Sequence, residues 1–279
     1  MRRLIINADD LGINPSRDHG IFECFERGVL TSATMIATGS GAQRAGELAR
    51  RMDMPTGLHF NITEGFPVNS QKNIASLLTP DGLFLDPRRL RRAIIAGHVD
   101  PRHIEREFRA QMERFMECRK TGPTHVDSHH NMHAHRQIVA ILAPLIPQYD
   151  ISCVRIADEP PPADYLDMTD ERKAYLRMLA EESRVARSLY EAHGLRSTDH
   201  FRGLAFSGNA GKKAFRQLVR TIPEGTTELM VHPGQCDPGG DEFSMNPQRE
   251  TEMEMLTDEE MPAFAARQKI EMISFRDLQ

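Results

Sequence analysis

Polar clusters follow four of the apolar segments in this 279-residue chain, and each cluster contains residues that could carry out chemistry. In chain order they are Asn7-Ala8-Asp9-Asp10, His59 with Asn61, the histidine-rich run from His125 to His135, and His232-Pro233-Gly234. In parallel α/β folds, catalytic groups gather at the carboxyl ends of the strands. If the apolar segments are strands of one sheet, the four clusters therefore converge on one site.

The adjacent pair Asp9 and Asp10 predicts a bound cation, because neighbouring carboxylates repel each other unless a positive charge compensates them. One carboxylate and two neutral imidazoles form a three-ligand metal site that leaves room for water. A metal ion in such a site lowers the pKa of the water and polarises a carbonyl group. The second aspartate could then act as the base on the water, and a separate histidine could protonate a leaving amine.

Each cluster taken alone also has a structural explanation. Paired aspartates after a strand often cap a helix, and a histidine inside an apolar strand is often a packed core residue. Five histidines between His125 and His135 are a composition typical of metal sites. The joint occurrence of the clusters, each after an apolar segment, favours a catalytic metal site. It leaves the individual roles of His125, His130 and His133 open.

The elements that must position these residues alternate between strands and helices. Apolar runs predict strands at residues 4–6, 31–37, 56–62, 124–128 and 151–155, with others at 201–206, 228–231 and 271–275. Helical spacing of apolar residues predicts helices at 18–29, 42–52, 88–96, 101–118, 138–146, 170–193, 212–220 and 262–268. The methionine-rich region 245–255 is interpreted as packing only.

This alternation predicts a parallel sheet with helices outside it. The sequence has neither an internal repeat nor a compositional boundary, so we expect one domain over residues 1–279. A TIM-like barrel needs about 250 residues and eight βα units, and eight equally convincing strands are not found. We therefore expect a barrel with seven strands or a distorted eighth, rather than an open doubly wound sheet. Residues 63–100 form an irregular excursion of the kind that often serves as a substrate loop.

The composition excludes several classes of protein. The net charge is -5 with acidic and basic residues interleaved, which makes nucleic acid an unfavourable partner. The four cysteines, Cys24, Cys118, Cys153 and Cys236, form no CxxC pair, which argues against a thiolate zinc site and a disulfide scaffold. No apolar run approaches the roughly 18 residues of a membrane helix, and the basic start is too short for a signal peptide. We expect a cytoplasmic protein without a membrane span.

Four segments together resemble the YdjC-like family, which includes chitooligosaccharide deacetylases and hopanoid-biosynthesis deacetylases. The segments are LIINADDLGINPSRDHGIFECFERGVLTSAT, GLHFNITEG, PTHVDSHHNMHAH and ELMVHPG. Their order and spacing agree with the family from the first strand to at least His232. The resemblance implies a (β/α) barrel related to polysaccharide deacetylases, a divalent ion that is Mg²⁺ or Zn²⁺, and an N-acetylated saccharide as substrate. It also suggests a homodimer, which is common among relatives.

Carried over position by position, the resemblance assigns the metal ligands to Asp10, His59 and His129. It makes Asp9 the base and His232 the acid or a partner of the oxyanion.

This chain departs from the family where many relatives have His-His-His-x-His, because Asn131 follows His129-His130. The departure puts a role for the middle histidine in doubt, but not the ligand at His129. Residues 155–160, which begin at Arg155, resemble a substrate-side loop.

Two other functions compete with a deacetylase. A metallo-phosphoesterase or another amidohydrolase could use a similar set of residues, but two-metal phosphoesterases usually need more carboxylates. A non-catalytic metal- or sugar-binding protein would keep His59 and His129, but would not need Asp9 beside Asp10 or His232. The acyl donor stays open among a chitobiose-type disaccharide, a lipid-linked amino sugar and another N-acyl amine. The ligand types suit Zn²⁺, and family habit leaves Mg²⁺ open.

Overall fold

The computed structural model describes residues 1–159, 168–207, 211–237, 239–240 and 242–279. Its strands are β1 (Arg2–Leu11), β2 (Ser32–Met35), β3 (Thr56–Phe60), β4 (Val126–Ser128), β5 (His200–Arg202), β6 (Gly225–Val231) and β7 (Ile270–Met272). Its α-helices are α1 (Pro15–Arg27), α2 (Ala42–Arg51), α3 (Pro87–Ile95), α4 (Pro101–Arg119), α5 (Arg136–Leu145), α6 (Asp170–Glu191), α7 (Lys212–Arg220), α8 (Gln248–Leu256) and α9 (Met261–Arg267). Short 3₁₀ helices are η1 (Gln71–Asn73), η2 (Ala75–Leu77), η3 (His129–Ala134), η4 (Ile146–Tyr149) and η5 (Phe275–Leu278).

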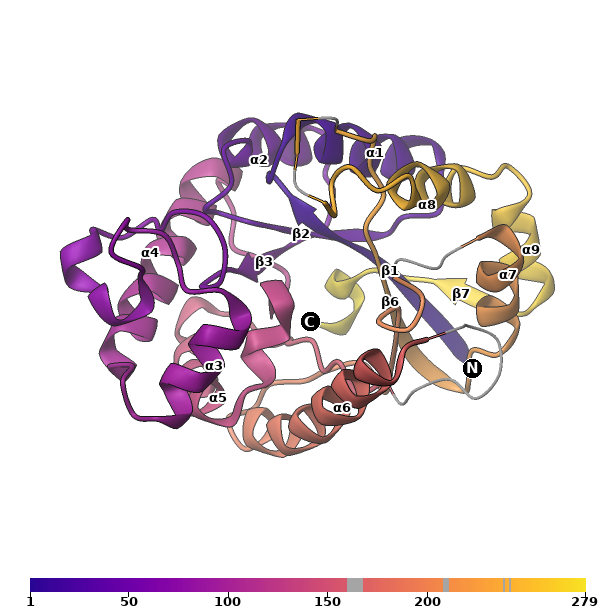
Figure 1. The fold of residues 1–279 in the computed structure, drawn as a ribbon. Coiled ribbons are helices and arrows are strands. Elements are labelled where there is room, and N and C mark those ends of the chain that lie inside the picture. Colours follow the sequence, from indigo (N-terminus) through magenta and orange to yellow (C-terminus); the bar gives the residue numbers. More distant parts are fainter. Residues whose placement is uncertain (160–167, 208–210, 238, 241) are drawn as a thin grey trace.

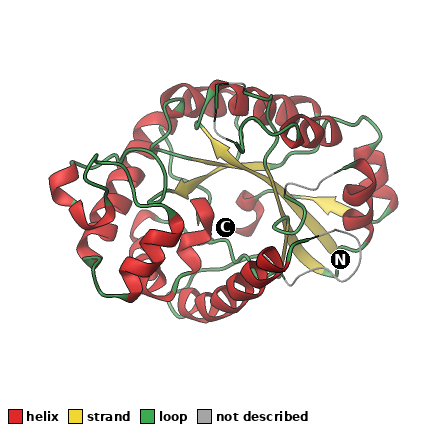
Figure 2. Ribbon diagram, in the orientation of Figure 1, coloured by secondary structure: helices red, strands yellow, loops and turns green. Residues whose placement is uncertain are grey.

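The strands form one parallel sheet in the order β4-β3-β2-β1-β6-β5, and β7 pairs with β1. The described part of the chain thus contributes seven strands to a sheet that curls into a half-barrel, with the helices around it (Figures 1 and 2). The expected seven-stranded or distorted barrel is confirmed. Within the described residues, no helix has both the length and the apolar composition needed to cross a bilayer.

Strand β1 is the centre of the sheet. Its residues 2–8 pair with β6 along one edge, while the other edge pairs with β7 at residues 2–4 and with β2 at residues 7–11. From Leu4 onward every residue of β1 is buried. Because β1 has neighbours on both edges and helices outside the sheet, its position is fixed by the rest of the fold.

The segment 151–155 is not a strand, although its apolar composition predicted one. It runs beside β4, where Val126 N–H donates to the Cys153 carbonyl at 3.1 Å and Arg155 N–H donates to the Val126 carbonyl at 3.0 Å. On its other side the Arg196 backbone pairs with it. Strand β4 and the stretch around Arg196 are both short, so the segment 151–155 pairs with each of them through a single bridge. This segment lies at the β4 edge of the sheet.

Other differences from the sequence-based expectations are local. Strand β1 runs to Leu11, so Asp9 and Asp10 lie inside it rather than after it. The strand expected at 201–206 ends at Arg202, and the one expected at 271–275 ends at Met272. Helix α8 overlaps the region interpreted as packing only, and it buries Arg249 and Glu252 as well as Met255. Its buried face is partly charged, so apolar spacing does not reveal it.

Candidate active site

A bulge in β1 brings two adjacent aspartates to the same pocket. The register against β2 shifts between Ala8 and Leu11, and Asp10 has a φ of 69°, in the left-handed region. Aspartate enters this region more readily than most residues. Successive side chains of a regular strand point to opposite faces, and the bulge breaks that alternation. As a result, Asp9 and Asp10 both line one cavity.

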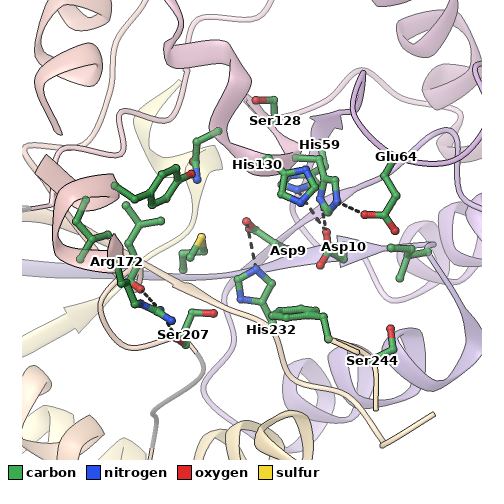
Figure 3. A pocket seen from close by; sticks show the side chains of 18 of the residues that line it. Asp9, Asp10, His59, Glu64, Ser128, His130, Arg172, Ser207, His232 and Ser244 are labelled. Carbon is green, nitrogen blue, oxygen red and sulfur yellow. Dashed lines mark hydrogen bonds and ion pairs between the residues drawn. The ribbon is translucent and has the colours of Figure 1, made fainter. Parts of the chain in front are cut away.

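Asp10, His59 and His129 come together from β1, β3 and the start of η3. Their candidate ligand atoms lie within 4.8 Å of one another. The Oδ1 atom of Asp10 is 3.4 Å from Nε2 of His59 and 3.1 Å from Nδ1 of His129. The structure therefore brings together the three residues that the resemblance implies as ligands, and Figure 3 shows Asp10 and His59 at one end of the cavity.

Each histidine of this group is held by a carboxylate at its other ring nitrogen. Nδ1 of His59 is 2.6 Å from Oδ1 of Asp127, and Nε2 of His129 is 2.9 Å from Oε2 of Glu64. A carboxylate at one ring nitrogen fixes the proton there and leaves the other nitrogen as a metal ligand. Both free nitrogens are directed toward Asp10.

These residues fit a divalent cation. Oδ1 of Asp10 is buried and meets ring nitrogens of His129 and His59 at 3.1 and 3.4 Å, without a hydrogen bond of regular geometry to any described residue. Burial opposes charge on His129, but Asp10 and Glu64 outweigh it and raise the pKa of His129 to about 10. The negative charges of Asp10 and Glu64 thus favour a cation at this position. A metal ion would compete there with the proton on His129. One carboxylate and two imidazoles would hold it with positions left for water.

A single buried guanidinium holds the carboxylates around this group. Arg155 is fully buried, and its Nη1 and Nη2 atoms bind Oδ2 and Oδ1 of Asp9, both at 2.7 Å. Nη1 is also 2.7 Å from Oδ2 of Asp127, and Nε donates to Oε1 of Glu228 at 2.7 Å. Burial alone would lower the pKa of Arg155, but Asp127, Asp9 and Glu228 hold it well above its ordinary value. Burial raises the pKa of Glu228 to about 7, against the opposing effect of Arg155.

The placement of Arg155 corrects the expectation for residues 155–160. This arginine lies inside the sheet, and the described residues that follow it do not line the cavity. Ile156, Ala157 and Glu159 are buried, and Glu159 accepts a hydrogen bond from the Ala205 backbone at 3.1 Å. Residue 160 lies outside the described residues. Residues 155–159 thus pack inside the fold behind the site and do not form a substrate-side loop.

The remaining contacts of Asp9 distinguish its two oxygens. Oδ1 accepts from Nδ2 of Asn7 at 3.0 Å and from Oγ1 of Thr34 at 3.2 Å, in addition to Arg155. Oδ2 accepts from Arg155, and Nε2 of His232 lies 3.9 Å away. A carboxylate oxygen has two lone pairs, so Oδ2 keeps acceptor capacity on the pocket side.

His232 follows β6 and is fixed through its backbone. Its N–H donates to Glu252 at 2.5 Å, and its carbonyl accepts from Arg249 at 3.0 Å and from Arg17 at 3.3 Å. The ring packs edge-on against Phe243, with centroids 5.2 Å apart. Burial lowers the pKa of His232 to about 3, so the resting imidazole is neutral. Within the described part of the chain, its Nδ1 has no hydrogen-bond partner.

The other histidines of the 125–135 run have different roles. His125 stacks on Phe275 with ring centroids 3.5 Å apart, and His133 joins Ser128 Oγ at 2.8 Å to the Arg155 carbonyl at 3.0 Å. Both are structural and do not line the cavity. His130 does line it, and its Nδ1 is 2.9 Å from Oγ1 of Thr63. The run at 125–135 therefore contains more histidines than reach the cavity.

The cavity that contains these groups has a volume of about 860 Å³, within the range of small-molecule sites. Figure 3 shows Asp10 and His59 on one side, Arg172 and Ser207 on the other, and Asp9 between them. The excursion at residues 63–100 contributes Glu64 and Arg88 to its lining. An apolar part of the wall consists of Ile13, Met168, Leu176, Leu204, Met230 and Phe243.

Comparisons with known proteins match a family model, curated relatives and a solved structure over nearly the whole chain. The family model described as YdjC-like protein matches residues 3–267. A carbohydrate deacetylase of Mus musculus is 35% identical, over 99% of this chain and 94% of its own. A carbohydrate deacetylase of Geobacillus stearothermophilus is 32% identical, over 99% and 98%. Among solved structures, a protein of Enterococcus faecalis V583 named for cellobiose-phosphate cleavage superposes with a TM-score of 0.78 at 26% identity, over 99% and 98% of the two chains.

The Arg155 cluster predicts a large asymmetry between two substitutions. Arg155→Met leaves buried carboxylates without their counter-charge and should lower the free energy of unfolding by about 3–5 kcal/mol. Glu228→Gln should change it by less than about 1 kcal/mol, because the raised pKa of Glu228 shows that its charged form gains little there. Urea denaturation of both variants checks this. Equal midpoints for Arg155→Met and the wild type would contradict the assigned role of Arg155.

Proposed function

Because the chain belongs to the YdjC-like family, we propose that it removes the acetyl group from an N-acetylated carbohydrate by metal-dependent hydrolysis. One observation carries the proposal: the buried Oδ1 of Asp10 faces ring nitrogens of His59 and His129 in the same cavity as Asp9 and His232. Asp10, His59 and His129 are the proposed ligands of a Zn²⁺ or Mg²⁺ ion. The imidazole ligands favour Zn²⁺.

When bound, the ion would polarise the acetyl carbonyl and lower the pKa of a water molecule. Asp9 is the proposed base. Its Oδ1 is occupied by Arg155, Asn7 and Thr34, so Oδ2 is the atom that takes a proton from the attacking water. The bidentate contact with Arg155 holds Oδ2 in place. Because this base is already oriented, no entropy has to be lost in orienting it during the reaction.

His232 is the proposed acid that protonates the leaving amine. Its resting ring is neutral, so it must gain a proton during the reaction before it can donate one. Nε2 lies 3.9 Å from Oδ2 of Asp9, which makes the proton taken from the water its nearest source. The proton would then pass from water to Asp9, to His232 and to the amine nitrogen, and the acetyl carbon–nitrogen bond would break.

The competing functions explain fewer of the contacts. A two-metal phosphoesterase needs further free carboxylates, whereas Asp127 and Glu228 are engaged by His59 and Arg155. A non-catalytic metal- or sugar-binding protein has no use for Asp9 fixed beside His232.

An acetate-release screen tests the proposal directly. The enzyme, stripped with a chelator and reloaded with Zn²⁺ or Mg²⁺, is offered N,N′-diacetylchitobiose, other N-acetylated saccharides and non-sugar N-acyl amines. We expect acetate release from at least one saccharide, loss of activity after chelation and its return with one of the ions. Activity that survives complete metal removal would contradict the metal-dependent proposal.

The neighbouring aspartates provide a matched pair of variants. Asp10→Asn should weaken metal binding, measured by calorimetry, by about 10-fold or more, because it removes the charged ligand. Asp9→Asn should bind metal like the wild type and lower turnover by about 10²-fold or more, the usual scale for a lost general base. Full activity of Asp9→Asn with unchanged metal content would rule out the base role.

The acid role of His232 predicts a dependence on the leaving group. His232→Ala should retain the metal and lose most of its amide hydrolysis, because an amine leaves poorly unless it is protonated. An activated ester such as 4-nitrophenyl acetate does not need this proton and should be spared much of the loss. Equal losses in kcat/KM on both substrates would mean that His232 stabilises the oxyanion or positions the substrate instead.

A further inference from the structure

His130 is an exposed imidazole that lines the cavity beside the proposed metal ligands, and the proposed reaction does not use it. Its ring centroid is 4.0 Å from that of His129, with an angle of 52° between the two planes. Figure 3 shows it beside His59, on the same side of the cavity as Asp10. A substrate whose acetamido group reaches Asp10 would therefore bring the neighbouring part of the sugar close to this ring.

The backbone of η3 fixes the direction of this side chain. His130 has φ 55° and ψ 22°, in the left-handed region, and Asn131 follows with φ 52° and ψ 31°. Histidine and asparagine are among the residue types that enter this region most readily. Such conformations persist when surrounding structure fixes them, and they cluster at functional sites. Here the turn places two consecutive histidines, His129 and His130, in the wall of one cavity.

The hydroxyl group of Thr63 holds one ring nitrogen of His130. Nδ1 is 2.9 Å from Oγ1 of Thr63, whose side chain is buried. Oδ1 of Asn61 lies farther from that hydroxyl, at 3.4 Å, and already accepts from the backbone N–H groups of Thr63 and Glu64 at 3.0 and 3.1 Å. The hydroxyl therefore donates its one hydrogen to Nδ1, which places the ring proton on Nε2. A doubly protonated ring also carries a hydrogen on Nε2, so this nitrogen is a donor in both charge states.

We propose that Nε2 of His130 donates a hydrogen bond to a hydroxyl oxygen of the saccharide, so that His130 helps to select N-acetylated carbohydrates over other N-acyl compounds. This proposal rests on the proposed function and assigns a substrate-binding residue to the same site. A saccharide carries hydroxyl groups around its acetamido group, and each hydroxyl oxygen can accept a hydrogen bond. A site that pairs with a substrate hydroxyl discriminates against an analogue that lacks it.

A metal site is the competing role for His130. The candidate ligand atoms of Glu64, His129 and His130 lie within 4.8 Å of one another. The carboxylate of this group is 44% exposed, however, whereas that of Asp10 is 3% exposed. A carboxylate in contact with water gains less from a cation than a buried one does. The ion therefore belongs at Asp10, and a measurement of metal affinity separates the two roles of His130.

The test compares His130→Gly with Thr63→Val. Glycine accepts the left-handed backbone and removes the ring, whereas valine at position 63 keeps the shape of threonine and removes the hydroxyl that orients the ring. The matched control is Lys120→Gly, a left-handed position with φ 61° at the exposed end of α4, outside the cavity. The substrates are N,N′-diacetylchitobiose, its monodeoxy analogues and 4-nitrophenyl acetate, which has no hydroxyl to recognise.

His130→Gly should lower kcat/KM for diacetylchitobiose by about 10-fold or more and that for 4-nitrophenyl acetate by no more than about twofold, because only the saccharide offers the hydroxyl. Thr63→Val should show a smaller loss of the same kind, and Lys120→Gly should match the wild type. With one monodeoxy analogue, the wild type and His130→Gly should become equal, because the hydroxyl that pairs with Nε2 is then missing. Such a double-mutant cycle isolates the contact.

Two calorimetric measurements accompany the kinetics. The Zn²⁺ affinity of His130→Gly should equal that of the wild type. In the Asp9→Asn background, which we expect to bind the saccharide with little turnover, His130→Gly should weaken the binding of diacetylchitobiose by about 10-fold.

Weaker Zn²⁺ binding by His130→Gly would identify His130 as a metal ligand and overturn the proposal. Equal losses on the saccharide and on 4-nitrophenyl acetate would show a structural role and also overturn it. Unchanged kcat/KM for the saccharide, or the absence of any deoxy analogue that equalises the two enzymes, would have the same consequence. Failure of the proposed function looks different: the wild type would release no acetate from any N-acetylated saccharide, and this proposal would then fall together with it.

Discussion

The guanidinium of Arg155 joins carboxylates from three strands at the centre of the curled sheet. Asp9 belongs to β1, Asp127 to β4 and Glu228 to β6, and the arginine itself comes from the irregular segment beside β4. A buried carboxylate is costly unless it is paired, and here one cation satisfies several of them. Of the carboxylates that Arg155 fixes, Asp127 also contacts His59, and Asp9 also lines the cavity.

The contacts of Arg155 also position a proposed metal ligand, His59, and the proposed base, Asp9. Asp127, held by Arg155, in turn holds Nδ1 of His59, so that Nε2 is directed at Asp10. Asp9, held by the same guanidinium, keeps Oδ2 toward His232. The bulge of β1 gives the two aspartates different surroundings: Asp9 is bound by Arg155, whereas Oδ1 of Asp10 faces the proposed ligands His59 and His129.

The fold and the location of the site follow from local patterns in the sequence. Apolar runs located most strands, and polar residues at the ends of these runs located the clusters of the site, because parallel strands bring their carboxyl ends to one edge. The resemblance to the YdjC-like family then selected Asp10, His59 and His129 as the proposed ligands. Arg155 was not predicted as a structural centre, since its partners lie on three different strands and leave no local pattern. The bulge depends on the backbone of Asp10, which composition does not encode. Histidine density could not separate His129 from His125 and His133, which pack internally.

The central claim is that one divalent ion binds Asp10, His59 and His129, while Asp9 stays out of the coordination sphere. An anomalous difference map from crystals of the full chain soaked with Zn²⁺ measures this directly. The account predicts a single strong peak in the cavity at roughly 2.0–2.3 Å from a carboxylate oxygen of Asp10, Nε2 of His59 and a ring nitrogen of His129. A peak coordinated by Asp9, or one held by Glu64, His129 and His130 without Asp10, would contradict it.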